Sequence, residues 1–338
     1  MKPSALLVLV FLAEISCQIV LARQESSLKE WLQYKRQYGK VYESPEEDAH
    51  RYLQFLATKQ RIDQHNNGNK QVSYKLGLNQ MADWTQKELA QLNEYRSDSV
   101  AVPRSWPKVS QRIDPYLQSI LSDRSPLPTE IDWRKVPNRV TGVKTQKGCN
   151  SGWAFATTGV LEGQQVARNF TKQLIPLSEQ QIIDCTLTAG GCSGGQVSDA
   201  LHYVAAMGGI DSERDYPYTA QYGLCWYLAS KIAMKITGFA ELGGDDNLKR
   251  LVANFGPVAI AFHKDSHFSH YKSGIIDDPC RQKELTEWAL VVGYGKDAKV
   301  GEYWIVKSSL TPSWGENGYF RIKRGICSIG SVITVPTF

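Results

Sequence analysis

The chain has 338 residues, 42% of them hydrophobic and 22% charged, which is enough apolar material for one large domain or two moderate ones and argues against a disordered chain. Lysine and arginine exceed aspartate and glutamate by 39 to 34 and are scattered, so the net charge of +5 argues against nucleic acid as a partner.

The N-terminus has the layout of a secretory signal peptide. Lys2 precedes an apolar run from Ala5 to Ala13, and mixed residues follow up to Ala22. The run is too short for a membrane anchor, which needs roughly 20 apolar residues. We therefore expect a signal peptide over residues 1–22, no membrane partner, and a protein that is secreted or enters the endolysosomal lumen.

The next segment, residues 27–91, is rich in charge and carries large apolar side chains at helical intervals. This periodicity predicts two amphipathic helices. The apolar positions are Trp31, Tyr34, Tyr38, Tyr42, Tyr52, Phe55 and Ile62. Prolines then gather between Tyr95 and Pro128, which predicts a linker or processing region over residues 98–126.

The composition changes after Ile131, where tryptophan and glycine become frequent. A helix is expected from about Gly152 to Arg168. From Phe255 onward, short apolar runs alternate with glycine-containing turns, which predicts a β-rich second half. The runs are Pro257–Phe262, Trp288–Val292, Trp304–Val306 and Tyr319–Ile322.

Cysteine is also frequent in the region after Ile131. One of the seven, Cys17, falls in the expected signal peptide, and the others are Cys149, Cys185, Cys192, Cys225, Cys280 and Cys327. An even number in an exported protein predicts three disulfides, and the residues alone leave their pairing open. A zinc site is the alternative, but Cys185 and Cys192 have no histidine or second close cysteine pair at ligand spacing. We expect no metal and no cofactor.

The stretch from Val143 to Phe155 resembles the segment that introduces the catalytic cysteine in the papain family of cysteine proteases. Matching motifs extend this resemblance over nearly all of residues 128–338. They are Asp132–Arg134, Leu177–Gln181, Asp184–Cys185, Gly191–Gly195, Tyr216–Tyr218, Gly256–Val258, Gly293–Gly295, Tyr303–Lys307 and Trp314–Tyr319.

The upstream region is similar to the propeptide of cathepsin L-like zymogens. Its helical signature is matched at five positions, with Thr58 where asparagine is usual, and the second propeptide motif is matched by Gly77–Asp83, with Met81 in place of phenylalanine. The five positions are Glu47, Arg51, Phe55, Ile62 and Asn66.

The resemblance implies an α+β, papain-like fold with two lobes and a helical N-terminal propeptide domain. A helical lobe would begin at about Leu127, a β-barrel-like lobe would follow Leu242, and a cleft would separate them. The implied domains are a signal peptide (1–22), a helical propeptide (23–97), a linker (98–126) and a papain-like mature domain (127–338). The resemblance also implies the disulfides Cys149–Cys192, Cys185–Cys225 and Cys280–Cys327.

The positions that carry papain-type chemistry hold other residues here. That chemistry needs a thiolate nucleophile, a histidine and an orienting asparagine. Counting from the matched motifs places Gly152, Glu287 and Ser308 at these positions. Since glycine offers no nucleophile, the resemblance implies an inactive homologue and not an enzyme. Cys149 is the nearest thiol, but the implied disulfide occupies it.

Other positions of the implied cleft are retained or changed. Gln146 stands where the family has its oxyanion-hole side chain, or it persists only as a surface amide. Gly194 and Gly195 match glycines that pair with extended peptide, or they serve the disulfide turn alone. Trp288 is expected to narrow the pocket for the second substrate residue, and Leu310 replaces a shielding tryptophan.

The leading hypothesis is a secreted pseudoprotease, a monomer that binds peptides, protease inhibitors or other extracellular proteins as a decoy. An alternative is that the propeptide inhibits active cathepsin L-like proteases in trans. A third is residual hydrolysis with Glu287 as general base in an apolar cleft. The sequon Asn169-Phe170-Thr171 predicts glycosylation of Asn169.

Overall fold

The computed structural model describes residues 5–68, 72–92, 95, 109–265 and 268–338. The chain divides into two compact units, which are described separately. The N-terminal unit comprises residues 1–69 and 77–86, and the main unit comprises residues 70–76 and 87–338. Within the described ranges, no helix combines the length and the apolar character needed to cross a membrane.

The N-terminal unit contains the two predicted helices, α1 (Ala5–Tyr38) and α2 (Pro45–Asn67). Helix α1 is longer than expected, because most of the predicted signal peptide continues directly into it. Helix α2 begins where its sequence dictates: the Ser44 side chain accepts the backbone N–H of Glu47, and Pro45 occupies the first turn, where its missing N–H costs nothing.

The core of this unit is aromatic. Trp31, Tyr34 and Phe55 are buried together with Ala82, and the Trp31 ring lies 5.3 Å from that of Phe55. Asp83 is buried beside them and accepts hydrogen bonds from Tyr34, at 2.6 Å, and from two further side chains. These are Tyr42 at 2.7 Å and Lys40 at 2.8 Å. One carboxylate therefore joins α1, the segment after it and the turn at residue 83.

The main unit is built on a large, mostly antiparallel sheet with the order β1-β8-β11-β10-β9-β7-β12-β6-β2, and β3 pairs with β9. The predicted β-rich second half is confirmed. The strands are β1 (Tyr74–Leu76), β2 (Ser110–Gln111), β3 (Ile131–Asp132), β6 (Gly238–Leu242), β7 (Val258–Phe262), β8 (Tyr271–Ile276), β9 (Glu287–Asp297), β10 (Gly301–Lys307), β11 (Tyr319–Lys323) and β12 (Val332–Thr337). Strands β4 (Ile210–Asp211) and β5 (Ile232–Met234) form a separate pair.

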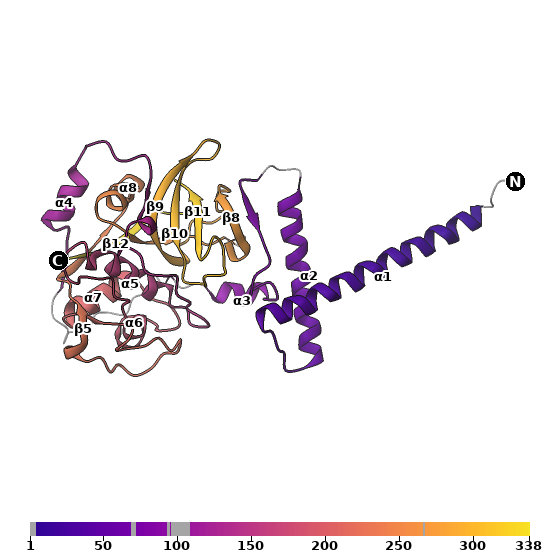
Figure 1. The fold of residues 1–338 in the computed structure, drawn as a ribbon, viewed down its shortest axis with the longest axis horizontal. Helices are drawn as coiled ribbons and strands as arrows, with labels where there is room; N and C mark the ends of the chain where they lie inside the picture. The colour runs from indigo at the N-terminus through magenta and orange to yellow at the C-terminus, as the bar shows by residue number, and fades with distance from the viewer. Residues whose placement is uncertain (1–4, 69–71, 93–94, 96–108, 266–267) are drawn as a thin grey trace. The chain divides into compact units, whose positions relative to one another are not determined.

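The helices of the main unit centre on α5 (Gly152–Gln165), which packs against β9, β7, α6 and α7 (Figure 1). It corresponds to the predicted helix and ends three residues before Arg168. All its side chains except Phe155 are buried, and small residues let it approach the sheet: a Cβ on Gly159 would lie 2.7 Å from Leu290. The other helices are α3 (Gln86–Gln91), α4 (Pro115–Ser122), α6 (Glu179–Cys185), α7 (Val197–Ala206), α8 (Asp245–Asn254), η1 (Trp133–Lys135), η2 (Ala229–Lys231) and η3 (Phe268–His270).

Part of the segment predicted as a linker is ordered structure. Strand β2 adds to the edge of the sheet by parallel pairing with β6, and α4 packs against α8. Asp114 caps α4 by accepting the Leu117 N–H at 2.8 Å, and the side chains of Leu117 and Ile120 are buried. Residues 109–122 are thus bound to the main unit by strand pairing and by apolar contacts.

Three disulfides join Cys149 to Cys192, Cys185 to Cys225 and Cys280 to Cys327, the pairs that the resemblance implied. Their partners are 43, 40 and 47 residues apart, so each closes a long loop of the unfolded chain. Such cross-links typically stabilise a fold by about 2–4 kcal/mol each. The disulfide between Cys149 and Cys192 also fixes the loop that precedes α5.

Candidate functional site

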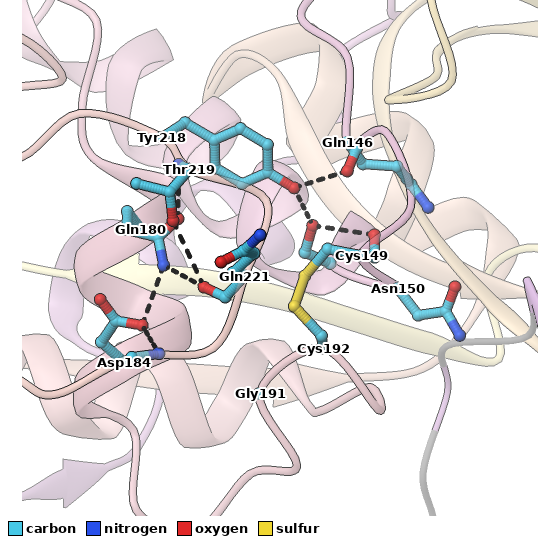
Figure 2. The surroundings of a disulfide bond; sticks show 12 residues. Gln146, Cys149, Asn150, Gln180, Asp184, Gly191, Cys192, Tyr218, Thr219 and Gln221 are labelled. Atoms are coloured by element: carbon cyan, nitrogen blue, oxygen red, sulfur yellow. Dashed lines mark hydrogen bonds between the residues drawn. A yellow bond between two sulfur atoms is a disulfide. The ribbon is translucent and has the colours of Figure 1, made fainter.

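Gly152 is the first residue of α5 and is buried. The backbone before it is held by a small hydrogen-bond network (Figure 2). The Tyr218 hydroxyl donates to the Gln146 carbonyl at 2.7 Å and is hydrogen-bonded to the Ser151 hydroxyl at 2.7 Å. The helix start is therefore rigid, and it presents only a hydrogen atom where a nucleophile would stand.

Gln146 is buried, with 2% of its surface exposed, so the interpretation as a surface amide is wrong. Its backbone N–H donates to the Ser309 carbonyl at 2.8 Å, and its side-chain carbonyl accepts the Ser309 hydroxyl. The amide is thereby oriented by the segment that follows β10. The side chain of Gln146 is thus fixed inside the protein, beside Ser309.

Glu287 opens β9 and is buried in an ion pair. Its carboxylate lies 2.7 Å from Lys264 Nζ, and the side chains of Glu287 and Lys264 are only 9% and 5% exposed. A second oxygen of the same carboxylate accepts the N–H of Trp288 at 3.2 Å. Because a buried charge is tolerated only when it is paired, Lys264 is what allows glutamate at this position.

Ser308 follows β10 and turns its hydroxyl back onto its own chain. The hydroxyl accepts the Leu310 N–H at 3.0 Å, while the Ser308 N–H donates to Gly318 at 3.0 Å. Leu310 is half-buried. The Ser308 hydroxyl thus stabilises the local turn that leads to Leu310.

A small cavity between α5 and the sheet brings several of these positions together. Gly152, Trp288 and Ser308 all line it, and Glu287 directly precedes Trp288. Its volume of about 20 Å³ is room for roughly one water molecule. The structure therefore gathers the predicted positions at one site, but leaves little empty space there.

Trp288 spans from β9 to the loop after Cys192. Its indole N–H donates to the Gly195 carbonyl at 3.1 Å, and only 2% of its surface is exposed. Backbone conformation and packing explain why Gly194 and Gly195 are glycines. Gly194 has a φ of +101°, and a Cβ on Gly195 would lie 2.7 Å from the Trp153 ring. The carbonyl of Gly195 thus accepts a hydrogen bond from this chain's own tryptophan.

Sequence reasoning missed three residues that contact this site, Gln91, Leu92 and Tyr95. Tyr95 forms a parallel β-bridge with Gly195, and its ring stacks on Trp288 with centroids 5.7 Å apart. Lys264 donates to the Leu92 carbonyl, and Asn150 donates to the Gln91 carbonyl. No motif marks these contacts, because they join segments far apart in the chain.

The far wall of the cavity is a buried cluster of charges. The ammonium of Lys144 contacts both Glu162, at 2.9 Å, and Glu179, and although burial opposes its charge, these carboxylates raise the pKa of Lys144. Burial lowers the pKa of Lys307 to about 8, and its amine donates to Thr141. Opposite charges therefore balance within the cluster.

Glu213 extends this cluster towards Tyr218, whose backbone N–H it accepts at 2.9 Å. Burial, with a contribution from the Glu179 carboxylate, raises the pKa of Glu213 from 4.5 to about 7. Between these values the folded state holds a proton that the unfolded state has released, so stability should fall as the pH rises from 4.5 to 7. Above pH 7 this loss persists.

We expect Glu213→Gln to remove the loss of folding stability that the Glu213 carboxyl causes above pH 4.5. Because the carboxylate is partly exposed, the gain in unfolding free energy at pH 8 should be about 1 kcal/mol, with little change at pH 4.5. Urea unfolding at both pH values measures it, and Glu130→Gln, at an exposed position, is the matched control. An equal effect of Glu213→Gln at both pH values would contradict the assignment.

Three comparisons place this geometry among known proteins. Residues 127–337 match the family model "Papain family cysteine protease", and residues 31–89 match "Cathepsin propeptide inhibitor domain (I29)". The chain is 35% identical to cathepsin L of Sarcophaga peregrina over 98% of both chains, and 35% identical to bovine (Bos taurus) cathepsin S over 91% of both. Among solved structures, the digestive procathepsin L2 proteinase of the Tenebrio molitor larval midgut matches with a TM-score of 0.82 and 35% identity, covering 92% of this chain and 100% of that one.

Proposed function

Because the chain belongs to the papain family of cysteine proteases and carries a cathepsin propeptide inhibitor domain, we propose that it is a secreted, catalytically inactive member of that family. In this role it binds peptides, protease inhibitors or other extracellular proteins instead of cutting them. The relatives named above are proteases, so the proposal depends on what differs at the site.

The observation that carries the proposal is Gly152 at the start of α5. Acyl transfer in this family needs a nucleophile at that point, and a base that activates it. Glycine has no side chain to attack a carbonyl, and the neighbouring Cys149 is bonded to Cys192. What remains is a buried Gln146 and a helix N-terminus, which can hold a carbonyl but cannot break its bond.

Hydrolysis with Glu287 as general base is the competing chemistry. A base must have a free oxygen to accept a proton from water, and one carboxylate oxygen of Glu287 lies 2.7 Å from Lys264 Nζ while the other accepts the Trp288 N–H. This contact favours a structural role for the carboxylate. If any hydrolysis is measured, its persistence in Glu287→Ala would exclude Glu287 as the base.

Capture of a protease inhibitor is the binding role to test first. Titration with a cystatin-type inhibitor should give a calorimetric signal once an added protease has removed the residues before residue 127. Uncleaved protein is the control, since Leu92 already contacts Lys264 and Tyr95 already contacts Trp288. Lack of binding by both samples at micromolar concentration would exclude a decoy for this inhibitor class.

A second candidate function rests on the N-terminal unit, which has its own aromatic core around Trp31 and Phe55. A propeptide that folds by itself can inhibit another protease in trans. Residues 24–97 should then inhibit a cathepsin L-like enzyme. Asp83→Ala, which removes the acceptor shared by Tyr34, Tyr42 and Lys40, should abolish the inhibition. Equal inhibition by both fragments would contradict this function.

Export predicts that Asn169 carries a glycan. It lies in the turn after α5, where it is exposed and adopts a φ of +60°. Protein secreted from eukaryotic cells should lose mass on treatment with an N-glycosidase, whereas Asn169→Gln should show the lower mass without treatment. A wild-type mass that does not change on treatment would contradict glycosylation or export.

A further inference from the structure

One loop of the main unit carries several large apolar side chains on its surface. In this apolar loop, residues 222–228, four such side chains are more than half exposed. They are Tyr222 (61%), Leu224 (88%), Trp226 (52%) and Leu228 (52%). Leu187 adds a fifth, because it lies close after Cys185, which a disulfide joins to Cys225 in the middle of the loop. Single exposed apolar residues are common, whereas a group of five indicates a binding surface.

The backbone of the apolar loop is fixed from beneath. The Gly223 N–H donates to the buried carboxylate of Asp184 at 2.8 Å. Just before the loop, Gln180 donates to the Gln221 carbonyl at 2.6 Å (Figure 2). The disulfide adds a covalent link to the same helix, α6. The apolar side chains therefore stand on a rigid base.

Trp226 shows how the loop presents its side chains. Its ring stacks on the buried ring of Tyr216, with centroids 3.9 Å apart and an angle of 17° between the planes. The Trp226 backbone N–H also donates to the Tyr216 hydroxyl at 3.3 Å. One face of the indole is thus supported by the protein, and about half of the residue remains open to solvent.

The exposed charges beside the apolar loop are basic. The sequence contains no acidic residue between Asp215 and Glu241, a stretch that includes Lys231 and Lys235. The side chains of Arg214 and Lys231 are 88% and 49% exposed. Both lie near the single carboxylate of Asp215, so one negative charge is shared by two positive ones.

The carboxylates near the loop are turned inward. Asp184 and Asp211 are 5% and 1% exposed. The side chain of Asp215 is 18% exposed and lies 3.3 Å from Lys231. Glu213 accepts a backbone N–H at 2.9 Å. The surface around the apolar loop therefore presents positive charge, which complements an anionic partner.

A lipid bilayer fits this surface better than a protein does. A stable protein–protein interface takes about 20–30 residues on each side, which is far more than this loop offers. At a bilayer, a few apolar side chains can enter the boundary between headgroups and acyl chains, while basic side chains contact anionic headgroups. Tryptophan and tyrosine are enriched at that boundary.

We propose that the apolar loop binds the surface of an anionic lipid bilayer, with Leu224, Trp226 and Leu228 inserted at the boundary. Arg214 and Lys231 contact the headgroups. No membrane partner was expected from the sequence, because it has no segment long enough to span a bilayer, but a surface contact needs none. The inference is independent of the chemistry at the catalytic position, so it stands or falls apart from the proposed function.

The test measures how much of the full chain sediments with lipid vesicles. Vesicles of phosphatidylcholine with added phosphatidylserine should bind it about fivefold more strongly than vesicles of phosphatidylcholine alone, because each net positive charge near an anionic surface contributes a factor of this size. Leu224→Ser combined with Leu228→Ser should reduce binding to the anionic vesicles at least tenfold. Both side chains are exposed, and the stacking of Trp226 on Tyr216 is kept.

Two controls locate the contact. Leu53→Ser removes an apolar side chain that is 62% exposed in the N-terminal unit, and it should bind like wild type. Trp226→Phe should also bind, but it should lose the blue shift of tryptophan fluorescence that anionic vesicles cause in wild type.

Three results would overturn the proposal. They are no binding to anionic vesicles, equal binding by wild type and the double leucine variant, and equal binding to the two kinds of vesicle. Sedimentation equilibrium without lipid examines the other occupant, a second copy of the chain. A wild-type dimer that the double leucine variant converts to a monomer would assign the loop to self-association instead.

Discussion

A Gly152→Cys variant is expected to have no measurable peptidase activity, although it places a thiol at the family's nucleophile position. The N-terminus of α5 would favour the thiolate to some extent. However, the position that would supply an imidazole to protonate the leaving amine holds Glu287, which is in an ion pair with Lys264. Hydrolysis of fluorogenic peptides measures the activity, and alkylation confirms that the thiol is free.

The matched variant carries Gly152→Cys, Glu287→His and Ser308→Asn together. Catalytic residues of this kind act as a unit. If the site can be rebuilt, the peptidase activity of the triple variant should therefore exceed that of Gly152→Cys by about 10³-fold. Adding Trp288→Gly frees the Gly195 carbonyl and should raise the rate further. Comparable activity in Gly152→Cys alone would mean that another group in this chain already acts as the base.

Glu162→Ala is expected to reduce the free energy of unfolding by about 3–5 kcal/mol, because it breaks a buried charge cluster. Glu162 is 1% exposed and accepts hydrogen bonds from Lys144, Thr141 and the backbone of Leu177. Without it, Lys144 keeps Glu179 and the Leu177 carbonyl, and the positive charge of Lys307 loses a nearby carboxylate. Urea unfolding followed by tryptophan fluorescence measures the change.

Glu302→Ala is the control for that experiment. Glu302 pairs with Lys249 and Arg324, but its side chain is 41% exposed, so its loss should cost about 1 kcal/mol or less. A cost for Glu162→Ala no greater than that for Glu302→Ala would show that the cluster does not stabilise the fold.

The sequence predicted the elements whose signals are local. The helix from Gly152 follows from the motif around Trp153, and the run Pro257–Phe262 became β7 because it is apolar on both faces. The segment around Pro115 was misread, because proline was taken as a sign of a linker. At the first turn of α4, after the capping residue Asp114, proline favours the helix instead.

The site was predicted as a set of positions but not as a set of interactions. Lys264 and Glu287 are 23 residues apart, and they meet because β7 and β9 pair with Phe262 opposite Glu287. That register depends on tertiary packing. The burial of Gln146 and the contact of Tyr95 with Trp288 are equally non-local, so composition and spacing could not reveal them.

Turnover by the purified secreted protein is the most direct test that this chain binds without cutting. The protein, with its N-terminal region removed by an added protease that is then inactivated and separated, should be incubated with a mixture of peptides and analysed by mass spectrometry. We predict that every peptide is recovered intact, at a level indistinguishable from Glu287→Ala. Cleavage that scales with protein concentration and disappears in Glu287→Ala would contradict the proposed function.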